Sequence, residues 1–226
     1  GPDTVDLLDR VVTCAVGDMN IGTSRPGALL TPQGKIIADF VLERTTDGCT
    51  LSVHEDAIEA LEKRLKLFRL RAEVDISRSN AIVVDVDHSA RITAGRPAYG
   101  YDFADADVFP TDVNLDLFDG IAYNKGCFVG QEVVSRMYRR GKIRKRTVVL
   151  NGDNLEKGMD VRAGNKLIGK ITSVSESNAL AILRIDNLAK AIEAVTDIEA
   201  GEKTVSVFRP DWLNEEITAL TAGEDA

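Results

Sequence analysis

One stretch of the chain brings a thiol, an amine and a carboxylate close together. Lys125, Cys127 and Glu132 lie within eight residues. A lysine two residues from a thiol is expected to lower the thiol pKa and favour the nucleophilic thiolate. If residues 128–139 form a helix, Cys127 lies at its N-terminus, where the helix dipole acts in the same direction. The pattern also fits a buried cysteine that packs as a small hydrophobe, so a functional and a structural thiol both stay open.

The neighbours of this cysteine also have two interpretations. Gly126 and Gly130 keep the backbone around it open. Glu132 and Arg136 are spaced i, i+4, so the simpler interpretation is an ion pair on a helix surface. The functional interpretation is that these two residues and Gln131 form a polar wall beside the thiol.

A basic run follows directly. Residues 133–150 contain seven Lys and Arg and no acid, whereas residues 101–119 contain six aspartates and no base. The chain carries a formal charge of -8, so the remainder without the basic run carries -15. We expect this electropositive patch on an acidic body to attract an anion: a phosphate, a polyglutamate tail or an acidic partner. The acidic balance argues against nucleic-acid binding as the main task.

Composition narrows the class of protein. The 226 residues, 44% hydrophobic and 28% charged, are typical of a globular protein with one large or two small domains. The cysteines Cys14, Cys49 and Cys127 are odd in number and far apart, which favours a reducing compartment over a disulfide framework. His54 and His88 are isolated, so no zinc pattern is present and we expect both to be structural. We find no secretion signal and no apolar run long enough to span a membrane.

Apolar periodicity predicts an α+β fold in two parts. The first part is expected to contain helices over 6–15, 56–68, 88–93 and 128–139, and strands over 28–30, 35–43, 49–53, 72–76, 81–86 and, briefly, 108–110. Strands over 144–150, 160–162, 166–174, 179–185 and 203–208 are separated by turns, which predicts a small β-barrel. The predicted domains are therefore residues 1–143 and 144–226, with a solvated acidic tail from Asp211 onward.

A resemblance to a known family rests on the stretch around Cys127. The string over residues 125–132, with Arg136, Gly141 and the basic residues 144–146, resembles the signature of the YgfZ family. Members of that family are folate-binding proteins that help maintain iron–sulfur enzymes, and mitochondrial relatives act in iron–sulfur cluster assembly. Residues 29–39 and 91–97 are also similar to family segments.

The resemblance implies an antiparallel α+β body and a C-terminal barrel around a central cavity that holds tetrahydrofolate or a one-carbon derivative. Cys127 would act there as a nucleophile or as a transient ligand to iron or an iron–sulfur cluster, with Lys125 as its activating partner. Gly126, Gly130, Gln131, Glu132 and Arg136 would complete the motif. Arg25, Lys35 and Arg144 are the expected contacts of the folate carboxylates.

The same framework is shared with the aminomethyltransferase (T-protein) of the glycine cleavage system. Those enzymes bind the folate ring through a glutamate. In this chain the residue at that position looks like Thr93. We therefore expect an accessory factor for assembly or repair of iron–sulfur proteins. The alternatives are a folate-dependent aminomethyltransferase and a non-catalytic folate-binding scaffold.

The expected partners are iron–sulfur assembly proteins or client enzymes, without a membrane and without nucleic acid as the main ligand. The expected location is the bacterial cytoplasm, or the mitochondrial matrix in a eukaryote. Family members begin with a strand before the first helix, so we expect that strand, and a loop near Asp87, to be missing from this sequence.

Overall fold

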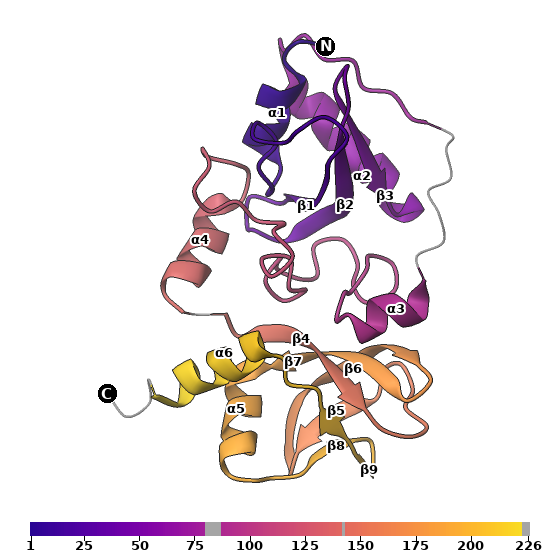
Figure 1. Cartoon of the computed structure of the whole chain (residues 1–226), viewed down its shortest axis with the longest axis vertical. Coiled ribbons are helices and arrows are strands. Elements are labelled where there is room, and N and C mark those ends of the chain that lie inside the picture. Colours follow the sequence, from indigo (N-terminus) through magenta and orange to yellow (C-terminus); the bar gives the residue numbers. More distant parts are fainter. Residues whose placement is uncertain (80–86, 142, 223–226) are drawn as a thin grey trace. The chain divides into compact units, whose positions relative to one another are not determined.

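The structure is a computed structural model that describes residues 1–79, 87–141 and 143–222 (Figure 1). The chain forms two compact units. The first comprises Gly1–Asp85 and Ala98–Lys142, and the second comprises Val86–Pro97 and Ile143–Ala226. Helix α3 (His88–Thr93) packs against the sheet of the second unit, where Ile92 contacts Val149 and Leu180. The predicted first domain, residues 1–143, included residues 87–97, which the structure assigns to the second unit.

The first unit is built on a three-stranded antiparallel sheet of order β1 (Ser24–Leu30), β2 (Ile36–Arg44) and β3 (Cys49–Val53). Its helices are α1 (Thr4–Val11), α2 (Glu55–Arg69) and α4 (Gln131–Arg139). Helix α2 contacts β2 and α1. The His54 side chain caps α2 by accepting a hydrogen bond from the Asp56 N–H, which is the structural role expected of this histidine.

Two glycines fix α4 against the hairpin between β1 and β2. The hairpin closes with a turn in which the Gly34 N–H donates to the Thr31 carbonyl. Gly130, the N-cap of α4, has φ 79°, and a Cβ there would lie 2.7 Å from the Thr31 carbonyl oxygen. Gly34 has φ +82°, and a Cβ there would lie 3.2 Å from the Val133 Cβ. Close backbone approach is therefore possible only because both residues are glycine.

Parts of the first unit differ from the predicted elements. Residues 72–76 form no strand, and the strand expected over 81–86 lies outside the described residues. Residues 108–110 form no regular strand, although the Val108 carbonyl accepts a hydrogen bond from the Ile36 N–H. Helix α4 begins at Gln131, three residues later than predicted, because Gly130 adopts a left-handed conformation.

The second unit is a seven-stranded antiparallel sheet in the order β10-β4-β7-β6-β5-β8-β9. Its strands are β4 (Lys145–Asn151), β5 (Asp160–Ala163), β6 (Lys166–Ser175), β7 (Asn178–Arg184), β8 (Ile198–Ala200), β9 (Lys203–Thr204) and β10 (Ser206–Val207). The curved sheet is drawn in orange and gold in Figure 1. Its core is formed by buried side chains that include Leu150, Val161, Ile168, Ile171 and Leu183.

Two helices complete this unit and were missed in the sequence. Helix α5 (Ile185–Glu193) contacts α6 (Asp211–Ala222). The prediction of a solvated tail from Asp211 was wrong over α6, because Leu213 and Ile217 lie one turn apart and are both buried. In addition, the Glu216 carboxylate pairs with the buried Arg146 at 2.9 Å. Across the described ranges, no helix is both long and apolar enough to span a membrane.

Replacing Gly130 with alanine is expected to destabilise the protein by about 2–4 kcal/mol. The new methyl group would be strained at positive φ and would collide with the Thr31 carbonyl. The midpoint of thermal unfolding, measured by circular dichroism, should fall by about 5–10 °C. Gly126→Ala is the matched control, because a Cβ at Gly126 meets nothing within 4 Å. Equal melting temperatures for the two variants would contradict this account of the Gly130 contact.

Candidate functional site

Lys125 fixes the loop that carries Cys127. The Lys125 Nζ donates to the carbonyl oxygens of Val12 and Cys14, both at 2.6 Å. It also lies 3.7 Å from the Asp9 Oδ1, and its side chain is only 9% exposed. Burial lowers the pKa of Lys125, and the negative charge of Asp9 opposes this shift. One cation thus ties the loop to the segment that follows α1.

That segment is itself a rigid support. The buried Thr13 hydroxyl donates to the Gly120 carbonyl at 2.6 Å and accepts from the Ala28 N–H at 2.8 Å. The Ala122 N–H donates to the Thr13 carbonyl at 2.9 Å. The segment therefore bridges β1 and the start of the loop. Lys125 binds to the backbone on either side of Thr13.

Cys127 lies two residues after Lys125 and is exposed. The next residue, Phe128, is buried, and its ring centroid lies 5.2 Å from the Lys125 Nζ. Since α4 begins only at Gln131, Cys127 precedes the helix by four residues. The predicted effect of the helix N-terminus on this thiol was therefore wrong. What the structure shows is an accessible thiol between two anchored points, Lys125 and Phe128.

Lys125 acts electrostatically on the buried thiol of Cys14. Burial raises the pKa of Cys14 to about 11, and the positive charges of Lys125 and Arg25 partly offset this rise. The amine two residues from Cys127 in sequence instead points toward residues more than a hundred positions earlier. Lys125 is therefore a positioning residue for the loop. Its predicted role as activator of the Cys127 thiol stays a prediction.

The remaining motif residues lie on the first turns of α4. Glu132 and Arg136 are exposed and Gln131 is half-buried. No ion pair joins Glu132 to Arg136 in the part of the chain that the structure describes, so the expected helix-surface pair is not formed. These side chains are left available to solvent or to a ligand. Gly126 is exposed with open space around it, in contrast to Gly130.

Two of the predicted folate contacts are already engaged. The Arg25 guanidinium pairs with Asp18 at 2.9 Å and with Asp119 at 3.2 Å. These residues line a pocket of about 320 Å³ whose acidic walls disfavour an anion. The Lys35 Nζ donates to the Asp107 carbonyl at 2.8 Å. Arg144, in the second unit, is exposed directly before β4.

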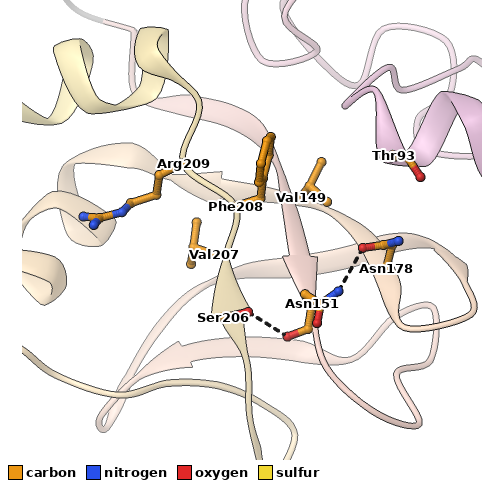
Figure 2. Close-up of a pocket in the computed structure, with 8 residues that line it drawn as sticks. All are labelled: Thr93, Val149, Asn151, Asn178, Ser206, Val207, Phe208 and Arg209. Carbon is orange, nitrogen blue, oxygen red and sulfur yellow. Dashed lines mark hydrogen bonds between the residues drawn. The ribbon is translucent and has the colours of Figure 1, made fainter.

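The second unit contains a larger pocket of about 430 Å³ (Figure 2). Its lining residues are Thr93, Val149, Asn151, Asn178, Ser206, Val207, Phe208 and Arg209. The Asn151 Nδ2 donates to the Asn178 Oδ1 at 3.0 Å. Phe208 is 59% exposed, and Arg209 extends away from the asparagine pair. The pocket thus combines two amides, an exposed aromatic ring and a cation.

Asp39 is a titratable residue that the sequence interpretation missed as a site candidate. It lies in β2, where burial raises the pKa of its carboxyl to about 6; its own backbone N–H opposes the shift and the charge of Asp102 adds to it. A single acid in the apolar string KIIADFVL was the available sequence signal. The carboxyl can change protonation state near neutral pH, so it is a candidate for proton exchange.

Within residues 1–79, 87–141 and 143–222, no three His, Cys, Asp or Glu side chains are grouped so that they could hold a metal ion. Cys14, Cys49 and Cys127 are all free thiols. His88 was expected to be structural, and its Nδ1 lies 3.1 Å from the Arg91 Nη2. Cys127 is the only one of the three thiols that is exposed.

Replacing Lys125 with methionine is expected to destabilise the protein by about 2–4 kcal/mol. The methionine retains the shape of the side chain but leaves the Val12 and Cys14 carbonyls without their donor. Urea unfolding followed by circular dichroism measures the loss. Lys35→Met is the control, since Lys35 reaches one carbonyl at an exposed position and should cost less than about 1 kcal/mol. Equal losses in both variants would show that Lys125 does not anchor the loop.

Comparison with known proteins finds a family model that matches the barrel of the second unit. Residues 144–215 match the family model of the CAF17 C-terminal β-barrel domain. The mitochondrial iron–sulfur cluster assembly factor IBA57 of Mus musculus is 29% identical over 179 residues, which cover 76% of this chain and 49% of that protein. The IBA57 homologue of Dictyostelium discoideum is 38% identical over 146 residues, 64% of this chain and 33% of that protein. The chain spans half or less of the length of these curated relatives.

A second kind of relative and a solved structure are also similar to this chain. The tRNA-modifying protein YgfZ of Blochmanniella pennsylvanica is 46% identical over 43 residues, 19% of this chain and 13% of that protein. The crystal structure of the glycine cleavage system aminomethyltransferase T from Bartonella henselae superposes with a TM-score of 0.73 at 15% identity, over 96% of this chain and 82% of that one. This likeness confirms the predicted α+β fold with its antiparallel barrel. Together the barrel domain, the relatives and the shared fold support a YgfZ-like family for this chain, as the motif around Cys127 predicted.

Proposed function

We propose that this protein is a folate-dependent accessory factor for the assembly or repair of iron–sulfur proteins. The observation that carries the proposal is the exposed Cys127 thiol on a loop held by Lys125 and Phe128. An accessible thiol at a fixed position is suited to bind iron or sulfur transiently. Relatives named as iron–sulfur cluster assembly factors support the same function.

A cluster would be cargo that this protein shares with another. Iron–sulfur clusters are commonly held by four ligands, whereas the described residues offer no group of three. Cys127 would supply one ligand, and the remaining ligands would come from a donor or client protein. Such sharing makes binding reversible, because removal of the partner removes most of the ligands.

The folate is proposed to bind in the pocket of the second unit. A volume of about 430 Å³ lies within the usual range for small-molecule sites. The Phe208 ring can stack on a pterin, and the amides of Asn151 and Asn178 can exchange hydrogen bonds with its edge. Arg209 lies on the opposite side of the pocket from Asn178, where it can pair with a carboxylate of the glutamate tail (Figure 2). The residues present therefore fit the ligand.

Thr93 supports this placement. It lines the same pocket, and in the sequence it resembles the position at which T-protein-like enzymes carry the glutamate that binds the folate ring. Threonine retains a hydroxyl for hydrogen bonding but has no carboxylate to hold or move a proton. Bound folate would supply one-carbon chemistry, and this chain would bind and orient it.

An aminomethyltransferase ranks second. The shared fold and the titratable Asp39 favour it, and Thr93 in place of glutamate disfavours it. A non-catalytic scaffold is disfavoured, because it assigns no function to the exposed Cys127 thiol. The compartment we propose is the bacterial cytoplasm or the mitochondrial matrix, because both are reducing and the three cysteines are free.

Cys127→Ser is expected to abolish the support of iron–sulfur enzymes without destabilising the protein. Since the thiol is exposed, its loss should change the free energy of unfolding by less than about 0.5 kcal/mol. The measurement is the activity of an iron–sulfur dehydratase in cells that lack the native protein and express the variant. Cys49→Ser serves as the control. Full activity with Cys127→Ser would refute the role of the thiol.

Phe208→Ala is expected to weaken tetrahydrofolate binding about tenfold, because it removes the ring on which the pterin would stack. Isothermal titration calorimetry on the full chain gives the dissociation constant. Leu167→Ala removes an exposed apolar side chain from β6, outside the pocket, and should leave affinity unchanged. An unchanged dissociation constant for Phe208→Ala would move the folate site elsewhere.

A further inference from the structure

We propose that the exposed face of α4 docks an acidic surface of a protein partner, next to Cys127. This basic face consists of Arg136, Arg139 and Arg140. The proposal deepens the proposed function by giving the kind of partner, and it rests on that function only for the cluster that the partner would carry.

The three arginines lie on one side of the helix and point to solvent. Arg139 and the C-cap Arg140 lie three and four residues after Arg136, so both are neighbours of Arg136 on the helical surface. All three are exposed, and the structure gives none of their side chains a hydrogen-bond or ion-pair partner within the described residues. Two other arginines of the first unit are engaged internally, Arg25 with Asp18 and Arg78 with Glu62. Internal packing therefore does not account for this cluster.

An aromatic side chain lies next to Arg139, about 100° around the helix from it and on the side away from Arg136 and Arg140. Tyr138 is 52% exposed, and its ring stacks on Tyr123 with centroids 4.0 Å apart and an interplanar angle of 14°. The stacking holds one ring face and leaves the side chain accessible, so little conformational entropy is lost when a partner covers it. Tyrosine and arginine are the residues most often found at the energetic centres of protein interfaces.

The geometry links docking to the thiol. Helix α4 is fixed through Gly130 on the turn at Thr31, and Lys125 anchors the other end of the loop. Cys127 and Gln131 are four residues apart, so their Cα atoms are at most about 14 Å apart. Arg136 lies five residues, or about 7.5 Å of helix, beyond Gln131, so a partner bound on the basic face would lie within about 22 Å of Cys127.

The charge distribution favours a protein over a nucleic acid. A long polyanion would extend beyond the basic face over a chain whose net charge is -8. The carboxylate of Glu132 lies beside the basic face, one turn before Arg136. It would repel a uniform polyanion, whereas a protein surface can place a hydrogen-bond donor there next to its acidic patch. A compact acidic patch matches the limited size of the face.

The test uses the 226-residue chain and a fluorescein-labelled oligoglutamate peptide as the probe, with binding followed by fluorescence anisotropy at low salt. The triple variant R136Q/R139Q/R140Q is expected to weaken binding about tenfold. The matched control K63Q/R64Q/R71Q removes three charges from another part of the first unit and should bind like the original protein. Tyr138→Ala should weaken binding as well.

Three outcomes would overturn the proposal. These are equal loss in the control variant, no binding of the peptide to the original chain, and tighter binding of an RNA oligonucleotide of equal charge, which would indicate a nucleic-acid partner. The assay contains neither iron nor folate, and Cys127→Ser should leave it unchanged. Failure of the docking surface is therefore distinguishable from failure of the iron–sulfur function, which the dehydratase assay reports separately.

Discussion

The site depends on one buried ammonium group. The Lys125 Nζ satisfies the carbonyls on either side of Thr13 and faces the Asp9 carboxylate. The loop from Ile121 to Gly130 has no regular secondary structure, so side-chain contacts must fix its course. A lysine buried in this way is stable only because the acceptors around it replace the water it has lost. The position of Cys127 thus follows from contacts made by its neighbours and not from its own.

The second constraint is the close approach of two backbones at Gly34 and Gly130. It joins two motifs that are distant in sequence, the hairpin turn and the loop before α4. The ammonium of Lys125 holds the loop on one side of Cys127, and the glycine contact holds it on the other. A thiol between two such anchors can be exposed without being mobile, which is a requirement for ligand exchange between proteins.

Much of the fold could be predicted from the sequence, because local periodicity determines it. The strand over 49–53, the helix over 88–93 and the turn at Gly34 all follow from short-range patterns. Tertiary contacts decide the rest. The strand expected over 72–76 does not form. The acids of α6 predicted a solvated tail, whereas the spacing of Leu213 and Ile217 gives the helix a buried face. Helix α4 starts later than predicted because Gly130, its N-cap, adopts a left-handed conformation.

The candidate site shows the same limit. The motif identified Cys127 and Lys125, but not the contacts of the amine with the Val12 and Cys14 carbonyls, which lie more than a hundred positions earlier in sequence. The basic run likewise combines two roles that composition cannot separate. Arg146 is buried and pairs with Glu216, so it belongs to the core of the second unit. Arg136, Arg139 and Arg140 are exposed on α4. Unlike Arg146, these exposed arginines can attract a partner, because a charge already neutralised inside the fold contributes little to the field outside it.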